Sequence, residues 1–270
     1  MIPKKFGPKL VLTIATVASV ATLFAADEHK EGYKDTPLIP GTQWHVHDSD
    51  RPVPRVVTPG AKFSQMADAP SDAVILFDGK DLSKWSGRKG EADWTIEDGY
   101  MEGVGGNIRT KEEFGNFQLH IEWATPAKVE SKSQGRGNNG VLIFGHYEIQ
   151  VLDSYNNPTY PDGQAGAIYG QKPPLVNASR GPGEWQTYDI TFEAPQFDDG
   201  GKLTKKAFVT VIHNGVVIHN HQEIIGATAH KAVGTYEGAK SKGPIELYYH
   251  NNAVRFRNIW IRNLGEYDKP

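Results

Sequence analysis

The sequence predicts an all-β protein, an antiparallel jelly-roll sandwich preceded by an extended arm. Three observations favour this class: many short β-type runs, turn residues between them, and no convincing 3.6-residue apolar period over three turns. Asn214-Gly215, between two β-branched runs, is the strongest hairpin signal, and Asp98-Gly99 is another. Many short strands with glycine-rich connections indicate a sandwich or jelly roll.

Residues 1–26 have the pattern of a secretory signal peptide. Lys4, Lys5 and Lys9 stand before or at the start of an apolar run that ends in small residues, and no acidic residue precedes Asp27. A retained signal anchor is the alternative, because the apolar run of about 17 residues is near the lower limit for a membrane span. We expect cleavage and bacterial export to the periplasm or the exterior, with no stable membrane insertion afterwards.

Residues 27–72 form the predicted arm. Six prolines punctuate this polar segment, and proline removes amide donors and fixes φ, so neither a helix nor a central strand fits. The segment also carries Trp44, His45 and His47, which a plain linker would not need. We therefore expect the arm to pack on the main domain, which spans residues 73–265.

Strands are expected throughout that domain, each bounded by turn residues. The expected strands span residues 74–77, 94–97, 100–104, 117–123, 141–144, 147–152, 188–192, 208–213, 216–219, 245–249 and 254–262.

Composition excludes several classes of function. The 270 residues include 29 Lys and Arg against 32 Asp and Glu, a net charge of −3 that argues against nucleic-acid binding. The chain has no cysteine, which excludes disulfide scaffolds, thiolate metal sites and thiol chemistry. Catalysis would therefore fall to carboxylates, histidines, tyrosines and arginines.

Strand alternation sorts three of the expected strands into an apolar and a polar face, because residues i and i+2 project to the same side. Each polar face contains histidine and a carboxylate, and none contains Lys, Ser or Thr. The polar residues are Gln118, His120 and Glu122; His146, Glu148 and Gln150; and Glu246, Tyr248 and His250. One alternative is an ordinary solvated outer face. The other is a sugar-binding site on one shared face, which Arg136, Asn138 and Asp153 would join.

A divalent metal ion is one further option for this face. His120, His146 and His250, with Glu122 or Glu148, are residue types that hold such a cation, which would also polarise a ketone. No metal ligand is assigned from the sequence, and no other cofactor is expected.

Several motifs along the chain together resemble the pattern of one known family. Residues 75–85 read ILFDGKDLSKW, close to the family's LFNGKDLSGW opening. Residues 147–153 read YEIQVLD, residues 183–189 GEWQTYD, and residues 254–261 VRFRNIWI. The family is the 3-keto-disaccharide hydrolase domain, formerly domain of unknown function 1080, and the resemblance covers about residues 73–264. Two departures stand out: Asn138-Asn139-Gly140 replaces the common GNSG, and Tyr249 replaces the acidic residue before His250.

The resemblance implies a concanavalin-like jelly roll and activity on glycosides oxidised at C3. A C3 ketone acidifies the C2 hydrogen, so a base can remove it, the C1 substituent can leave by elimination, and water can add to the enone. The hypothesis assigns the base to Glu148 or a neighbouring histidine such as His146, and the acid to His250.

The remaining candidates would contact the substrate. Arg136 and Gln150 are assigned to the oxyanion and hydroxyl groups. The other expected substrate contacts are Asn138, Asp153, His120, Glu122 and Tyr248. Two alternatives stay open: a two-carboxylate glycosidase that pairs Glu148 with Glu122 or Glu246, and a non-catalytic carbohydrate-binding module.

Overall fold

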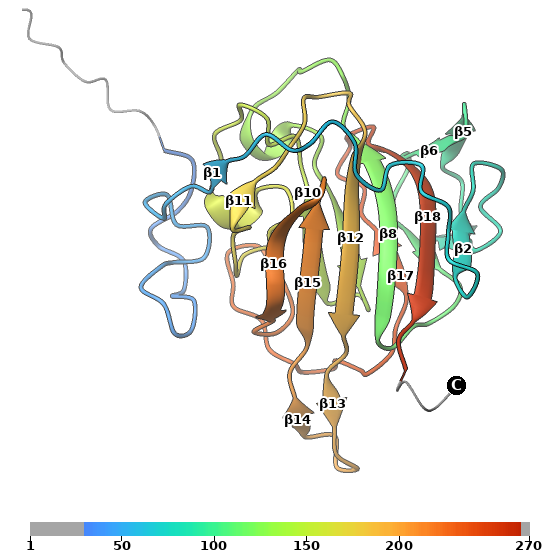
Figure 1. Cartoon of the computed structure of the whole chain (residues 1–270). Coiled ribbons are helices and arrows are strands. Elements are labelled where there is room, and N and C mark those ends of the chain that lie inside the picture. The colour runs from blue at the N-terminus through green and yellow to red at the C-terminus, as the bar shows by residue number, and fades with distance from the viewer. Residues whose placement is uncertain (1–29, 266–270) are drawn as a thin grey trace, which may run out of the picture.

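Two antiparallel β-sheets packed face to face form the body of the protein (Figure 1). This computed structural model describes residues 30–265, so the predicted signal peptide of residues 1–26 lies outside the described residues. The all-β prediction is confirmed. In the described part of the chain, no helix has the length and apolar character needed to cross a membrane.

The larger sheet has eight strands. Their order is β16 (Val216–Glu223), β15 (Phe208–His213), β12 (Gln186–Glu193), β8 (Phe117–Ala124), β18 (Arg255–Asn263), β6 (Tyr100–Glu102) and β5 (Thr95–Glu97), with β2 (Val74–Phe77) also paired to β18.

The smaller sheet has six strands and carries the candidate active site. Their order is β10 (Tyr147–Val151), β9 (Asn139–Ile143), β17 (Ile245–Leu247), β7 (Ile108–Thr110), β3 (Trp85–Gly87) and β4 (Gly90–Glu91). Two short pairs and two 3₁₀ turns complete the described elements. These are β1 (Arg55–Val56) with β11 (Val176–Asn177), β13 (Gln196–Phe197) with β14 (Leu203–Lys205), η1 (Ser133–Gly135) and η2 (Pro161–Gly163).

Aromatic residues at alternate positions fill the space between the sheets. On β8, Phe117 and Trp123 are fully buried, and their rings lie 5.3 Å from Phe192 and 5.2 Å from Tyr188 of β12. The Tyr188 hydroxyl crosses the sandwich and donates to the Gln150 carbonyl of β10 at 2.7 Å. Burying each such side chain contributes roughly 1.5–3 kcal/mol, so the alternating pattern holds the two sheets together.

Both predicted hairpin turns form. Asn214 and Gly215 have φ values of 51° and 84° and connect β15 to β16. Asp98 and Gly99, with φ values of 46° and 78°, connect β5 to β6 in the same way. Positive φ at both central positions fits a type I′ turn, whose twist matches that of the flanking strands.

The expectation that three polar strand faces form one site is wrong for one strand. β8 belongs to the eight-stranded sheet, whereas β10 and β17 belong to the six-stranded sheet. A sandwich has two outer faces, so the polar residues of β8, His120 and Glu122, point away from the core on the opposite side of the molecule from Glu148. Alternation assigns a residue to the outside of a sheet but does not say which sheet.

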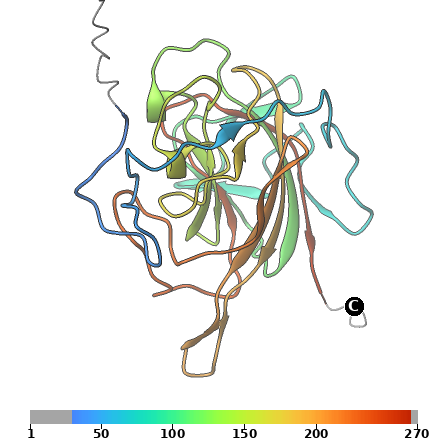
Figure 2. The same ribbon diagram turned by 60° about the vertical axis from the view of Figure 1, so that its left-hand side comes forward.

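The segment before β2 packs against the body in two places (Figures 1 and 2). Residues 30–54 form loops beside β1 and β11, where the His47 amide donates to Asp162 at 2.9 Å. Residues 57–73 then cross the outer face of the eight-stranded sheet, where the Met66 amide donates to Glu122. The first of these contacts lies next to the candidate active site.

Candidate active site

A cavity of about 380 Å³ lies on the outer face of the six-stranded sheet, at the edge formed by β10. One strand and four loops supply its walls. The lining residues are Gln134, Asn138, Glu148, Tyr160, Tyr169, Thr228, Ala229, His230, Tyr248 and His250. The structure thus brings together four of the predicted site residues, Asn138, Glu148, Tyr248 and His250, with six others.

Glu148 is the acidic residue at the centre of this cavity wall. It lies on β10 opposite Leu142 of β9, and its side chain folds over Gly140, where a Cβ atom would stand 2.2 Å from Glu148 Oε1. Its amide and carbonyl are bonded to the surrounding loops, through Thr228 Oγ1 at 3.1 Å and the Tyr169 amide at 3.1 Å. Burial raises the pKa of Glu148 to about 8, because a carboxylate loses hydration there. The group is therefore a neutral acid at pH 7.

Gln150 is the neighbour of Glu148 on the same face of β10. Its side-chain amide is best satisfied with the nitrogen turned towards Glu148, where it donates to the Asn139 carbonyl and to Glu148 Oε1, each at 3.0 Å. The amide therefore helps to hold the Glu148 carboxyl group in position.

A chain of hydrogen bonds runs along the opposite wall. The Tyr160 and Tyr169 hydroxyls lie 3.0 Å apart, and the Tyr169 hydroxyl lies 3.1 Å from His230 Nδ1. Burial raises the pKa of both tyrosines, so both keep their protons. Burial also lowers the pKa of His230, and His47 and Lys231 lower it further. This wall offers neutral donors and acceptors, a combination suited to sugar hydroxyl groups.

Tyr248 and His250, which follow β17, close the cavity. Burial raises the pKa of Tyr248 to about 12, and the nearby Glu148 and Glu246 carboxyl groups add to the effect. His250 is exposed at the rim of the cavity, and desolvation by the residues around it lowers its pKa below the ordinary 6.5. His250 is therefore a neutral imidazole at pH 7, able to accept a proton.

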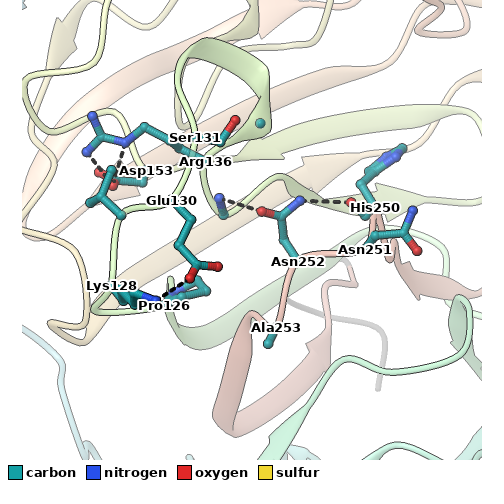
Figure 3. Close-up of a pocket in the computed structure, with 13 residues that line it drawn as sticks. Pro126, Lys128, Glu130, Ser131, Arg136, Asp153, His250, Asn251, Asn252 and Ala253 are labelled. Carbon is teal, nitrogen blue, oxygen red and sulfur yellow. Dashed lines mark hydrogen bonds and ion pairs between the residues drawn. The ribbon is translucent and has the colours of Figure 1, made fainter.

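Arg136 and Asp153 lie in a neighbouring cavity of about 550 Å³, which shares His250 with the first (Figure 3). The guanidinium donates to Asp153 Oδ2 through Nε at 3.0 Å and through Nη2, and to the Tyr155 and Asn156 carbonyls. Asp153 is only 3% exposed. These bonds fix the loop after β10, and they use the donors that the sequence hypothesis assigned to an oxyanion.

The other predicted residues lie apart from the cavity. His146 stands in the turn between β9 and β10, and its carbonyl accepts from Thr228. His120 Nδ1 bonds Asp189 at 2.7 Å, and Glu122 accepts from Arg257 Nε at 2.8 Å on the outer face of the other sheet. Within residues 30–265, no group of three or more His, Cys, Asp or Glu side chains is placed to hold a metal ion. The histidine and glutamate side chains that the sequence left open as a metal site are therefore not brought together in the described part of the chain.

Several cavity residues carried no signal in the sequence. Gln134, Tyr160, Tyr169, Thr228 and His230 come from η1 and from irregular segments, where no side-chain period exists to assign a face. Residues 157–171 are almost entirely buried despite their polar and glycine-rich composition. Long ordered loops of this kind are commonly functional, but that order becomes visible only in the folded structure.

The family assignment follows from residues 72–262, which match the family described as the 3-keto-alpha-glucoside-1,2-lyase-like domain. The chain belongs to this family. The matched region includes β10, β17 and every residue that lines the cavity. The resemblance inferred from the sequence motifs is thereby confirmed.

Individual relatives agree with the family assignment. A 3-keto-disaccharide hydrolase from Bacteroides thetaiotaomicron is 29% identical over 230 residues, covering 71% of this chain and 78% of the relative. A solved structure from Parabacteroides distasonis, provisionally named a glycosyl hydrolase, is 48% identical with a TM-score of 0.72, covering 79% and 93% of the two chains. Another from that organism, with the same provisional name, is 22% identical with a TM-score of 0.53, covering 72% and 94%, and shows the shared fold. The family and these relatives indicate a carbohydrate-active enzyme that acts on glycosides.

Proposed function

We propose that this protein is an exported enzyme that cleaves the glycosidic bond of 3-keto-glycosides by elimination followed by hydration. One observation carries the proposal: a neutral carboxylic acid, Glu148, and a neutral imidazole, His250, line the same cavity. Groups whose environments move their pKa values in opposite directions are suited to act as acid and base. The names of the family and of the Bacteroides relative support the substrate class.

The proposed reaction begins at C2 of the oxidised sugar. His250 Nε2 or Nδ1 takes the C2 proton, and the electron pair moves towards the C3 carbonyl to give an enediolate. The pair then returns, the C1–O bond breaks, and the departing oxygen takes a proton from Glu148. Water adds at C1 of the resulting enone, with a proton added at C2, and yields the free 3-keto sugar. The net change is hydrolysis without any redox step.

Hydrogen-bond donors in the cavity would stabilise the enediolate. Tyr248 keeps its hydroxyl proton at pH 7, since its pKa is raised to about 12, and it lines the cavity with Glu148. Donors that face a developing oxyanion lower the barrier because no reorganisation is needed when the charge forms. We assign this role to the Tyr248 phenol.

The pKa directions reverse the roles in the sequence hypothesis. That hypothesis gave Glu148 the base and His250 the acid, whereas a raised carboxyl pKa and a lowered imidazole pKa favour the opposite arrangement at pH 7. The two-carboxylate alternative is less well supported. In the described part of the chain Glu148 is the one acidic residue that lines this cavity, because Glu122 lies on the other sheet and Glu246 lines a separate cavity.

Solvent exchange at C2 separates the two roles. A 3-keto-disaccharide is incubated in D₂O with the protein, and mass spectrometry follows deuterium at C2 and release of the leaving sugar. We expect Glu148→Gln to keep exchange but to release sugar at least about 100-fold more slowly, because the acid is lost. We expect His250→Gln to lose both. Glu246→Gln, on the same sheet face but outside the cavity, is the matched control and should keep both.

Two results would overturn this assignment. Full sugar release by Glu148→Gln would remove its role as acid, and exchange that depends on Glu148 rather than His250 would restore the reverse roles. Cleavage of the unoxidised parent disaccharide would favour a conventional glycosidase instead. Binding of either sugar without turnover would favour a non-catalytic carbohydrate-binding module.

A further inference from the structure

His47 is an arm residue that lies against the cavity wall. It stands outside residues 72–262, which match the family, and its side chain is fully buried. Its backbone φ of 58° is in the left-handed region, which few residue types adopt readily. A buried histidine at such a position, in a segment with little regular structure, calls for an explanation in terms of what the ring contacts.

Asp162, at the centre of η2, holds His47 in place. Its carboxylate accepts from the His47 amide at 2.9 Å and from His47 Nδ1 at 3.1 Å, and Arg51 Nη1 lies 3.8 Å away. All three residues are buried. The arm is thus tied to the loop that carries Tyr160 and Tyr169, and the orientation of the imidazole is set.

The fixed ring packs against the wall of the cavity. The His47 centroid lies 4.1 Å from Tyr160, 4.8 Å from Tyr169 and 5.2 Å from His230. These three residues form the hydrogen-bonded wall described above. Tyr33, also from the arm, adds an edge-on contact to His230 at 5.9 Å. Both rings therefore support the side of the wall that faces away from the cavity.

Stability alone does not account for a histidine here. With Nδ1 bonded to Asp162, the other ring nitrogen, Nε2, is buried and finds no partner among residues 30–265. An unpaired buried polar atom costs free energy that an apolar ring would avoid. The polar ring is consistent with a role in setting the position of the wall.

We propose that His47 is a positioning residue for sugar recognition, and that the arm is therefore a working part of the active site. Anchored on Asp162, its ring sets where the hydroxyls of Tyr160 and Tyr169 and the imidazole of His230 stand. These groups bind sugar hydroxyls, so the arm determines substrate affinity. The identity of the sugar rests on the function proposed above, whereas the positioning role does not.

His47→Asn is the informative variant. Asparagine tolerates a left-handed φ and keeps a donor near Asp162, while the ring that supports the wall is removed. We expect KM for a 3-keto-disaccharide to rise about tenfold or more, with kcat within about threefold of the original, because binding rather than chemistry is affected. His45→Asn is the matched control: His45 lies in the same arm, bonds the Thr36 carbonyl, and should leave both constants unchanged.

A second measurement does not depend on activity. NMR titration of labelled imidazoles follows His230, whose pKa His47 helps to lower. In His47→Asn we expect the His230 resonances to move and its pKa to rise, and in His45→Asn to stay as in the unmodified protein. Unchanged His230 signals in His47→Asn, equal effects of both variants, or a fall in kcat with constant KM would overturn the proposal. If the unmodified protein cleaves no 3-keto-glycoside, the proposed function fails while this titration still decides the role of His47.

Discussion

At the scale of single residues, the site depends on a glycine beneath a carboxyl group. The Glu148 side chain occupies the volume above Gly140, and a Cβ atom built on Gly140 would stand 2.2 Å from Oε1 and 2.9 Å from both Cγ and Cδ of Glu148. The φ of Gly140 is not in the positive region, so the backbone itself would accept alanine. The glycine is therefore required by the position of Glu148 rather than by its own conformation.

Gly140→Ala should consequently impair catalysis by moving Glu148. We expect sugar release to fall by about 100-fold or more, because small misplacements of a reacting group are costly, with a loss of about 1–3 kcal/mol in the free energy of unfolding. Activity assays and urea denaturation test this. Gly60→Ala, at an arm position where a Cβ atom meets nothing within 4 Å, is the control. Normal activity in Gly140→Ala would show that Glu148 tolerates displacement.

At the scale of elements, the second contact of the arm is a buried polar cluster on the eight-stranded sheet. Glu122 of β8 accepts from Arg257 Nε at 2.8 Å, from Asn258 Nδ2 at 3.0 Å and from the Met66 amide of the crossing segment. Burial opposes ionisation, but these bonds and His120 outweigh it and lower the pKa of Glu122 to about 2. The strand pattern predicted that Glu122 would contact a sugar substrate. Its observed contacts instead attach residues 57–73 to the sheet.

Replacing this carboxylate should destabilise the fold rather than the chemistry. In Glu122→Gln one side-chain atom becomes a donor and faces the donors of Arg257 or Asn258, and the partly buried Arg257 guanidinium loses its counter-charge. We expect a loss of about 3 kcal/mol in the free energy of unfolding. The partly exposed Glu193 of β12 pairs with Lys205 of β14 at 2.7 Å, and Glu193→Gln should cost less than about 1 kcal/mol. Equal losses of stability in the two variants would show that Glu122 does not attach residues 57–73 to the sheet.

The sequence could predict which segments form strands and which side chains point into the sandwich, because both are local properties. The alternation of Phe117 and Leu119 with His120 on β8 assigned inside and outside correctly, as did that of Ile149 with Glu148 on β10. Strand partners could not be predicted in this way. Whether β8 lies beside β10 or beside β12 and β18 depends on pairings between residues far apart in the chain, and no period records them.

At the scale of the whole molecule, the candidate active site is assembled from distant segments. The cavity is formed by η1, β10 and the loops after β10, β16 and β17, and the arm packs behind its wall through His47. Glu148 and His250 could be predicted because they lie on or next to strands with a clear pattern. Tyr160 and His230 could not, because their loops acquire positions only once the sandwich and the arm have folded around them.

The raised pKa of Glu148 lowers the free energy of unfolding of the protein at neutral pH. The pKa of Glu148 is about 8 in the folded chain and near its usual 4.5 in the unfolded chain, so at low pH the group is protonated in both states. As the pH rises above 4.5, the unfolded chain releases this proton while the folded chain keeps it. The folded state therefore loses relative stability up to about pH 8, and the loss reaches about 3 kcal/mol at pH 7.

Glu148→Gln should remove this pH dependence, since glutamine is nearly isosteric and does not ionise. We expect the stability of the variant relative to the unmodified protein to increase steadily from pH 5 to pH 8, by about 3 kcal/mol or more. Urea denaturation of both proteins across this range measures the difference, and only its change with pH matters, so any constant effect of the substitution cancels. Stability curves that run parallel would mean that Glu148 ionises near its ordinary pKa in the folded protein. In that case it could not serve as the neutral acid, and the base at C2 would have to be sought in Glu148 itself.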